Sequence, residues 1–167
     1  SAETLSAYLR EQRGVRPTFR IFPEHDQSIY MPITFIEPES TNAAAIGLDV
    51  AHETNRRMAA LASRDTGTAQ ITGPITLVQD ESSTPGFLFY TPFGTGGAVY
   101  APFVVHKLME GLLATELRNV RFSIHDAGTV IYNEHTAEDE LYDADPMYAD
   151  RVEVDLYGRT WTVDVRT

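Results

Sequence analysis

The sequence predicts an α+β protein built from two successive lobes, each combining a helix with an antiparallel sheet. Short segments that alternate apolar and polar residues recur along the chain and are joined by glycine turns, as in antiparallel strands. Other segments place their apolar residues at helical spacing, and this helix-plus-strand pattern restarts after residue 103. The 167 residues, 43% of them hydrophobic, are enough to bury a core. We therefore expect an N-terminal helical remnant over 1–16, a first lobe over 17–103 and a second lobe over 104–167.

The N-terminal region predicts one helix and two strands. Apolar residues at helical spacing predict a helix over Ala2–Gln12, which we expect Gly14 to end. Alternation predicts strands over Thr18–Phe22 and Ile29–Phe35. Pro32 lies inside the second of these segments, which favours an edge position or a bulge.

The rest of the first lobe predicts a helix followed by three strands. Thr54 could cap a helix over Thr54–Thr66, and Gly67 supplies the left-handed residue that ends it. The strands that follow are expected over Gln70–Val78, Gly86–Phe93 and Gly97–Phe103. This order of strands and helix resembles the PAS fold, in which a sheet of five strands cups a small pocket against helices.

The second lobe predicts an amphipathic helix from Val105 to about Leu117 and then two hairpins. Short glycine turns separate the paired strands, Asp126-Ala127-Gly128 in the first hairpin and Tyr157-Gly158 in the second. An acidic loop over 134–145 lies between the hairpins.

Composition excludes several classes of function. The net charge of −11 argues against nucleic acid and anionic lipid as partners, because both require a basic surface. The absence of cysteine excludes disulfide scaffolds, thiolate metal sites and cysteine nucleophiles. The uncharged run over 82–105 contains three prolines and four glycines, which a membrane-spanning helix would not tolerate.

Motifs for catalysis or metal binding are missing from the sequence. There is no G-x-S-x-G elbow, and His52-Glu53 lacks the second histidine of a zinc protease motif. In the acidic loop, Asp143 and Asp145 begin like an EF-hand, but Met147 occupies the next ligand position. We therefore predict no catalytic residue, no metal site and no cofactor.

Two groups of residues are candidates for binding a small molecule. Tyr90 and Tyr100 lie in an aromatic-rich pair of strands, and buried tyrosine hydroxyls need polar partners. Arg56 and Arg57 lie in the first turn of the predicted helix over Thr54–Thr66, where guanidinium groups and backbone N–H groups could both receive an anion. The alternatives are ordinary core packing for the tyrosines and solvation for the arginines.

Several motifs in the same order resemble the CHASE domain, the extracytoplasmic sensor of receptor kinases and cyclic-nucleotide enzymes. The resemblance runs from about residue 17 to about residue 113. The matching stretches are Phe19-Arg20-Ile21-Phe22-Pro23, Tyr30-Met31-Pro32-Ile33-Thr34-Phe35-Ile36-Glu37-Pro38, Asn42-Ala43-Ala44-Ala45-Ile46-Gly47-Leu48-Asp49-Val50, Arg56-Arg57, Arg64-Asp65-Thr66-Gly67, Ile71-Thr72-Gly73-Pro74-Ile75-Thr76-Leu77-Val78-Gln79, Gly86-Phe87-Leu88-Phe89-Tyr90-Thr91-Pro92-Phe93 and Gly97-Ala98-Val99-Tyr100-Ala101-Pro102-Phe103.

The resemblance implies two PAS-like lobes with the ligand pocket in the first, membrane-distal lobe. It also implies a long stalk helix and flanking membrane helices, so this chain is expected to be a piece of a larger receptor. By the same match the pocket includes Thr72, Val78 and Tyr90, and Arg56 replaces the acidic side chain with which plant cytokinin receptors of this family hold adenine. We therefore expect a ligand that carries hydrogen-bond acceptors or negative charge.

Our first hypothesis is a non-catalytic sensor domain of a transmembrane receptor of the histidine kinase or diguanylate cyclase type. It would be the periplasmic part of an inner-membrane protein, would bind a small molecule in its first lobe and would form a homodimer in the full receptor. The alternative is a structural dimerisation and signal-relay module with no ligand of its own.

Overall fold

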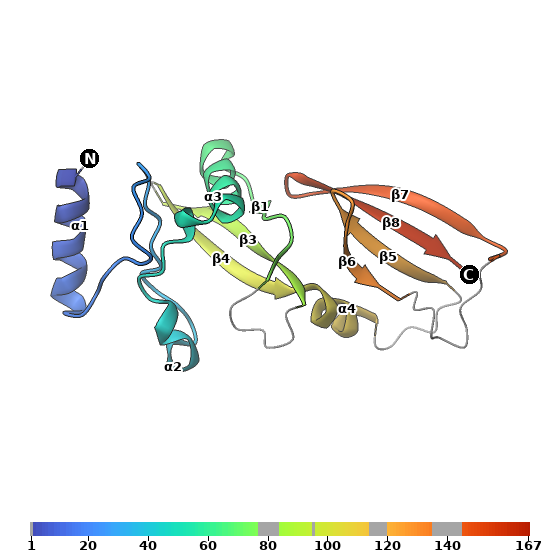
Figure 1. Cartoon of the computed structure of the whole chain (residues 1–167), viewed down its shortest axis with the longest axis horizontal. Coiled ribbons are helices and arrows are strands. Elements are labelled where there is room, and N and C mark those ends of the chain that lie inside the picture. The colour runs from blue at the N-terminus through green and yellow to red at the C-terminus, as the bar shows by residue number, and fades with distance from the viewer. Residues whose placement is uncertain (1, 77–83, 95, 114–119, 135–144) are drawn as a thin grey trace. The chain divides into compact units, whose positions relative to one another are not determined.

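The chain forms an α+β structure with four α-helices and two antiparallel sheets in the residues described by the computed structural model (Figure 1). These are residues 2–76, 84–94, 96–113, 120–134 and 145–167. The chain divides into two compact units, Ser1–Arg57 and Met58–Thr167. We describe each unit separately.

Helix α1 (Ala2–Val15) opens the first unit and continues through Gly14, so the expectation that this glycine ends it is wrong. The amide of Arg16 still donates to the carbonyl of Gln12. Pro17 follows immediately, and the residue before a proline is disfavoured in helical conformation. Proline, rather than glycine, therefore explains where the helix stops.

The first unit contains none of the strands predicted over Thr18–Phe22 and Ile29–Phe35. These segments form only two isolated bridges, Phe22 with Leu48 and Pro32 with Asp49. Pro32 lies inside the second segment, and Pro23 and Pro38 follow the two segments. A proline has no N–H to continue a ladder of hydrogen bonds. A short helix α2 (Glu39–Asn42) and two 3₁₀ turns, Ala43–Ala45 and Val50–His52, complete the unit.

Helix α3 spans Thr54–Thr66, as predicted, but Glu53 caps its N-terminus rather than Thr54. The Glu53 carboxylate accepts the amides of Asn55 at 2.8 Å and Arg56 at 2.9 Å, which would otherwise lack partners in the first turn. Gly67 ends the helix with a φ of 68° and donates its amide to the Ser63 carbonyl.

The first sheet is centred on strand β3 (Pro85–Phe93), which pairs along its length with β4 (Gly97–Val104). On the other side of β3 lie two strands of two residues each, β1 (Gln70–Ile71) and β2 (Ile75–Thr76). The single strand predicted over Gln70–Val78 is thus broken at 72–74, where Gly73 and Pro74 interrupt the ladder.

The second sheet follows helix α4 (Val105–Leu113) and consists of two hairpins. Strands β5 (Arg121–Asp126) and β6 (Thr129–Asn133) form the first hairpin, and β7 (Ala149–Leu156) and β8 (Arg159–Arg166) form the second. Their order is β6-β5-β8-β7, so β7 lies at one end of the sheet formed by the described strands. The predicted end of α4 at Leu117 and most of the acidic loop lie outside the described residues.

One hydrophobic core draws on both sheets of the second unit. Its buried members come from β1, β3, α4, β5, β6 and β8: Ile71, Phe87, Val105, Ile124, Ile131 and Trp161. The Phe87 and Trp161 rings meet edge to face with their centroids 5.6 Å apart. The predicted lobe boundaries at residues 16 and 103 stay predictions, and this core is formed by residues from both sides of the second boundary.

Candidate functional site

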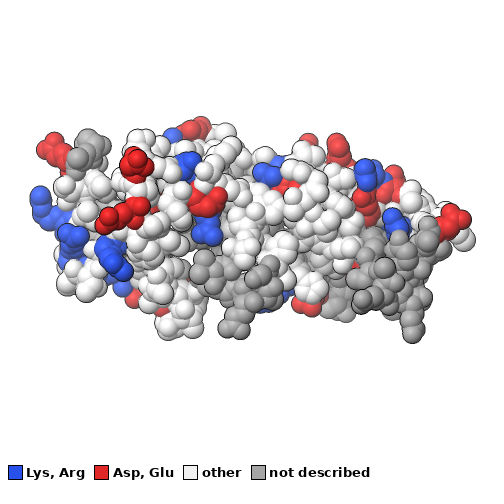
Figure 2. All heavy atoms as spheres, in the orientation of Figure 1, with Lys and Arg blue, Asp and Glu red and all other residues white. Residues whose placement is uncertain are grey.

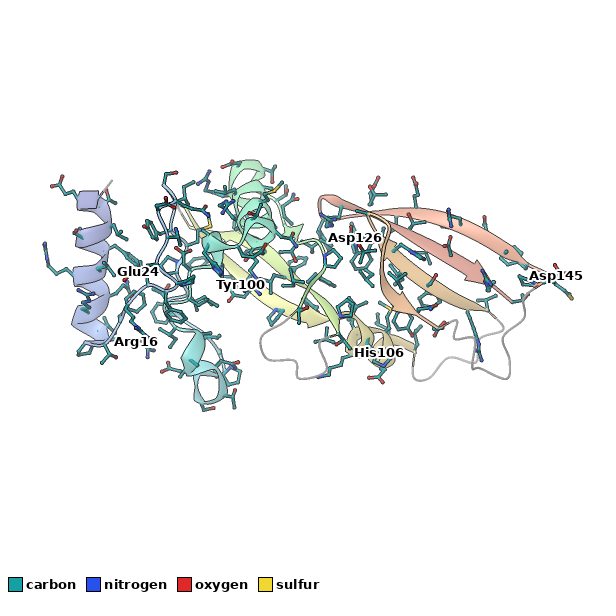
Figure 3. The ribbon with its side chains drawn as sticks, viewed as in Figure 1. Arg16, Glu24, Tyr100, His106, Asp126 and Asp145 are labelled. Atoms are coloured by element: carbon teal, nitrogen blue, oxygen red, sulfur yellow. The ribbon has the colours of Figure 1, made fainter. Side chains whose placement is uncertain are left out.

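Tyr90 and Tyr100 lie opposite each other on β3 and β4. Their ring centroids are 5.3 Å apart and the ring planes are tilted by 43°. Tyr90 is buried and Tyr100, which Figure 3 labels, is half-buried. Because side chains alternate along a strand, Leu88 lies on the same face of β3 as Tyr90. The sheet thus brings together the two predicted tyrosines.

Thr72 reaches this same strand through two hydrogen bonds to Leu88. Its amide donates to the Leu88 carbonyl at 3.0 Å, and its hydroxyl accepts the Leu88 amide at 3.0 Å. The side chain replaces a missing backbone acceptor where the chain breaks between β1 and β2. A threonine hydroxyl has a second lone pair and a proton, so these bonds leave it capacity for a ligand.

Arg57 is engaged by three acceptors within the first unit. Its guanidinium donates to the Gln27 side-chain carbonyl, to the Ala51 carbonyl at 2.8 Å and to the Thr54 hydroxyl at 3.2 Å. These bonds fasten the start of α3 to two irregular segments. These three hydrogen bonds give the Arg57 guanidinium a structural role that requires no ligand.

Arg56 is held differently. Only 14% of its side chain is exposed, and the nearest carboxylate oxygen, on Glu53, lies 3.9 Å from its Nε. Within the described residues that buried Nε has no hydrogen-bond partner. The Glu53 carboxylate accepts the first-turn amides of α3, and in this position its nearer oxygen stays beyond hydrogen-bond distance of the Arg56 Nε.

The structure groups the predicted site residues by unit. Tyr90 and Tyr100 lie in one sheet of the second unit, and Thr72 is hydrogen-bonded to that sheet, whereas Arg56 and Arg57 belong to the first unit. Val78 lies outside the described residues. The assignment of all of them to one pocket stays a prediction.

The sequence did not single out a buried pair formed by His25 and Asp49. Asp49 is fully buried, and its Oδ1 accepts the amides of Met31 and Ala51, both at 2.8 Å. The His25 Nε2 lies 2.9 Å from Asp49 Oδ2, and its Nδ1 accepts the Gln27 amide at 3.3 Å. This acceptor role assigns the proton to Nε2, which therefore donates to Asp49.

A serine, a histidine and an aspartate also meet on the second sheet, but not as a nucleophilic triad. The Ser123 hydroxyl and the Asp164 carboxylate both approach Nε2 of His125, at 3.0 and 3.4 Å. A triad needs the serine and the aspartate on different ring nitrogens. Hydrogen bonds from Arg151 lower the pKa of the Asp164 carboxyl, with smaller contributions from His125 and Arg166. We therefore interpret the cluster as polar side-chain pairing between neighbouring strands, in which Ser123 and Arg151 both lie opposite Asp164.

We also searched the described segments for metal-binding clusters and for membrane-spanning helices. In those segments no three histidine, aspartate or glutamate side chains gather as metal ligands. None of the helices in the same segments has the length and hydropathy required to cross a membrane. Glu53, His25 and Asp49 are the polar residues that sequence reasoning missed, because their partners depend on irregular backbone that no periodicity marks.

The family model described as the CHASE domain matches residues 1–142. No curated protein matches the chain.

Proposed function

The chain belongs to the CHASE domain family, whose members are non-catalytic extracellular sensor domains of signalling receptors, and we propose that it senses a small molecule rich in hydrogen-bond acceptors or negative charge. The observation that carries this proposal is the buried Nε of Arg56, which lacks a hydrogen-bond partner within the described residues. An unsatisfied buried donor costs about 1–3 kcal/mol, so an acceptor supplied by a ligand would be strongly favoured there.

Further residues support a binding role in the predicted first lobe. Tyr90 and Tyr100 offer ring faces and hydroxyls, and Thr72 keeps hydrogen-bonding capacity beyond its bonds to Leu88. We assign Val78 to the same site from the family resemblance. We add Arg57 because a second guanidinium in the first turn of α3 could also receive an anion. We further propose that both lobes are PAS-like, with the ligand lobe distal to the membrane.

The setting of the domain is also part of the proposal. We place it in the periplasm, as the sensor of an inner-membrane receptor with a histidine kinase or diguanylate cyclase output. We expect the receptor to be a homodimer, in which ligand binding favours one of two arrangements because the ligand has different affinities for them.

One observation favours a second candidate function, a structural dimerisation and relay module without a ligand. Arg57 is already engaged by three acceptors, and Thr72 already completes the pairing of β3. Two of the six predicted ligand residues thus form hydrogen bonds within the protein that would hold them in place without any ligand.

A thermal-shift screen of anionic and acceptor-rich metabolites separates the two candidates, because a specific ligand raises the melting temperature by mass action. Under the sensor proposal at least one compound shifts the wild-type protein, and Arg56→Ala weakens its binding about tenfold or more, as expected for a lost charged hydrogen bond. Arg10→Ala, which changes an exposed arginine of α1, is the matched control. A screen with no shift, or equal affinity in Arg56→Ala, would contradict the proposal.

A further inference from the structure

A groove in the first unit lies between the segment that follows α1 and the turn after α2. Its volume is about 280 Å³, and its walls include Arg16, Arg20, Phe22, Ala43 and Ile46. Known small-molecule sites mostly range over about 300–1,000 Å³, so the groove suits only a small ligand. None of these residues belongs to the pocket proposed above.

Arg20 presents a cation at this groove. Its guanidinium carbon lies 5.8 Å from the centroid of the Phe22 ring, over the ring face. No carboxylate of the described segments forms an ion pair with it. A guanidinium stacked on a ring keeps its N–H edge free, and that edge matches the two oxygens of a carboxylate.

Arg16 shows how a carboxylate can be held at the same groove. It donates to both oxygens of Glu39, at 2.9 and 2.6 Å, and this pair joins the end of α1 to α2. Figure 3 labels Arg16 at the end of α1. Because Arg16 already neutralises Glu39, the charge of Arg20 is left for a ligand.

The segment over 10–20, which lines one side of the groove, is basic although the chain as a whole carries a net charge of −11. Four arginines lie between residues 10 and 20, and Figure 2 shows basic side chains gathered over α1. Arg13 is one of them and donates to the carbonyl of Phe19, another wall residue. These arginines favour an anion over a cation on this side of the groove.

The wall beside Phe22 is shaped by a glycine. A Cβ at Gly47 would lie 2.0 Å from the Arg20 carbonyl oxygen and 3.3 Å from the Phe22 ring, so any side chain here would displace the segment that carries Arg20. The φ of 89° at Gly47 also favours glycine. The close approach keeps Phe22 and Arg20 in position at the groove.

We propose that this groove is a second ligand site, which binds a small organic carboxylate with an apolar body. The carboxylate pairs with the Arg20 guanidinium, and the apolar body lies against Phe22 and Ile46. This site is independent of the sensor pocket, so either assignment stands if the other fails.

Titration of the ¹⁵N-labelled chain with benzoate tests the proposal, with benzyl alcohol as the uncharged counterpart. We expect benzoate to shift the amide signals of residues 18–22 and 43–47 with a dissociation constant on the order of 1 mM, typical of so small a ligand. Benzyl alcohol should bind at least about fivefold more weakly, because it cannot pair with the guanidinium. Equal binding of the two probes, or no shift with benzoate, would overturn the proposal.

Three variants complete the test. Arg20→Gln removes the cation and should weaken benzoate about fivefold or more, while Arg10→Gln, a change on the same basic surface, should leave it unaltered. Ala43→Leu fills the groove and should block both probes even if the first variant proves unstable. Unchanged benzoate affinity in Arg20→Gln or in Ala43→Leu, each checked for folding by its amide spectrum, would overturn the assignment.

Discussion

Asp49 joins three segments of the first unit through one fully buried carboxylate. In Asp49→Asn the new amide group would meet either a backbone N–H or the Nε2–H of His25, so two donors would face each other. We expect the variant to lose about 2 kcal/mol of unfolding free energy, as for other buried groups that lose a partner. Urea denaturation followed by circular dichroism measures this loss.

Asp26→Asn is the control for this prediction, because Asp26 is exposed and lies in the same segment as His25. It should change the unfolding free energy by less than about 0.5 kcal/mol, as surface substitutions usually do. Similar stability of the two variants would show that the buried carboxylate is not needed to hold these segments.

The pair formed by Arg151 and Asp164 predicts a pH dependence. Because the folded state lowers the pKa of Asp164, the stability that the pair contributes is present above the unfolded carboxyl pKa and is lost as the pH falls through the folded one. Arg151→Gln should therefore melt below the wild type near neutral pH. The two melting temperatures should converge in acid, and a gap that persists there would contradict the prediction.

For single residues, the sequence indicates which side chains could bind a ligand, but it does not predict their hydrogen-bond partners. It singles out Arg57 and Thr72, yet Arg57 is held by acceptors at Gln27, Ala51 and Thr54, which come from irregular segments. The hydrogen bond from the Leu88 amide to the Thr72 hydroxyl depends on the break between β1 and β2. Such partners are set by tertiary structure, which no spacing in the sequence encodes.

Among the elements, the two hairpin turns of the second sheet form a matched pair. Gly128 and Gly158 have φ values of 82° and 83°, and each follows a residue that also has a positive φ. A Cβ at Gly128 would meet nothing within 4 Å, whereas a Cβ at Gly158 would lie 1.8 Å from Oε1 of Gln70, the first residue of β1. The Ile71 amide also donates to the Tyr157 carbonyl at 3.0 Å, so the second turn is docked on the first sheet.

We therefore expect Gly158→Ala to destabilise the chain more than Gly128→Ala. Both variants bear the left-handed strain of about 1–2 kcal/mol, and Gly158→Ala must also displace the Gln70 side chain. Adding Gln70→Ala to Gly158→Ala should restore the stability to that of Gly128→Ala. Chemical denaturation of these two variants, the double variant and the wild type measures this. Equal losses in the two single variants would contradict the prediction and show that the Gln70 side chain moves aside without cost.

The sequence predicts the helices and hairpins that are marked by a capping residue or a glycine turn. It does not predict the irregular segments of the first unit. Helix α3 has the predicted bounds, and its stop at Gly67 is confirmed. The hairpins of the second sheet are confirmed with their glycine turns. The strands predicted in the first unit are wrong, because alternation alone does not supply a partner strand, and these segments form only isolated bridges.

On the scale of the whole molecule, the core shared by the two sheets predicts cooperative unfolding of the second unit. Phe87 from β3 contacts Trp161 from β8, and the chain has one tryptophan. Phe87→Ala should cost about 3–5 kcal/mol. The transition followed by Trp161 fluorescence should move together with the amide protection of β3 and β4.

The outcome bears on the lobes predicted over 17–103 and 104–167. If tryptophan fluorescence and hydrogen exchange in the first sheet shift to the same extent, the two sheets unfold as one cooperative unit. Two separate transitions, with only the first sheet affected by Phe87→Ala, would instead show independent lobes.

Strand β7 lies at the end of the described strand order and carries acidic side chains at 150, 153 and 155. Its register with β8 turns the Arg151 amide away from the sheet, and the Asp150 carboxylate accepts that amide at 2.8 Å. An incoming strand would meet repelling carboxylates and a donor that is already taken. The exposed border of the second sheet is thereby protected against aggregation by strand addition, and a dimer of this chain is expected to use another surface.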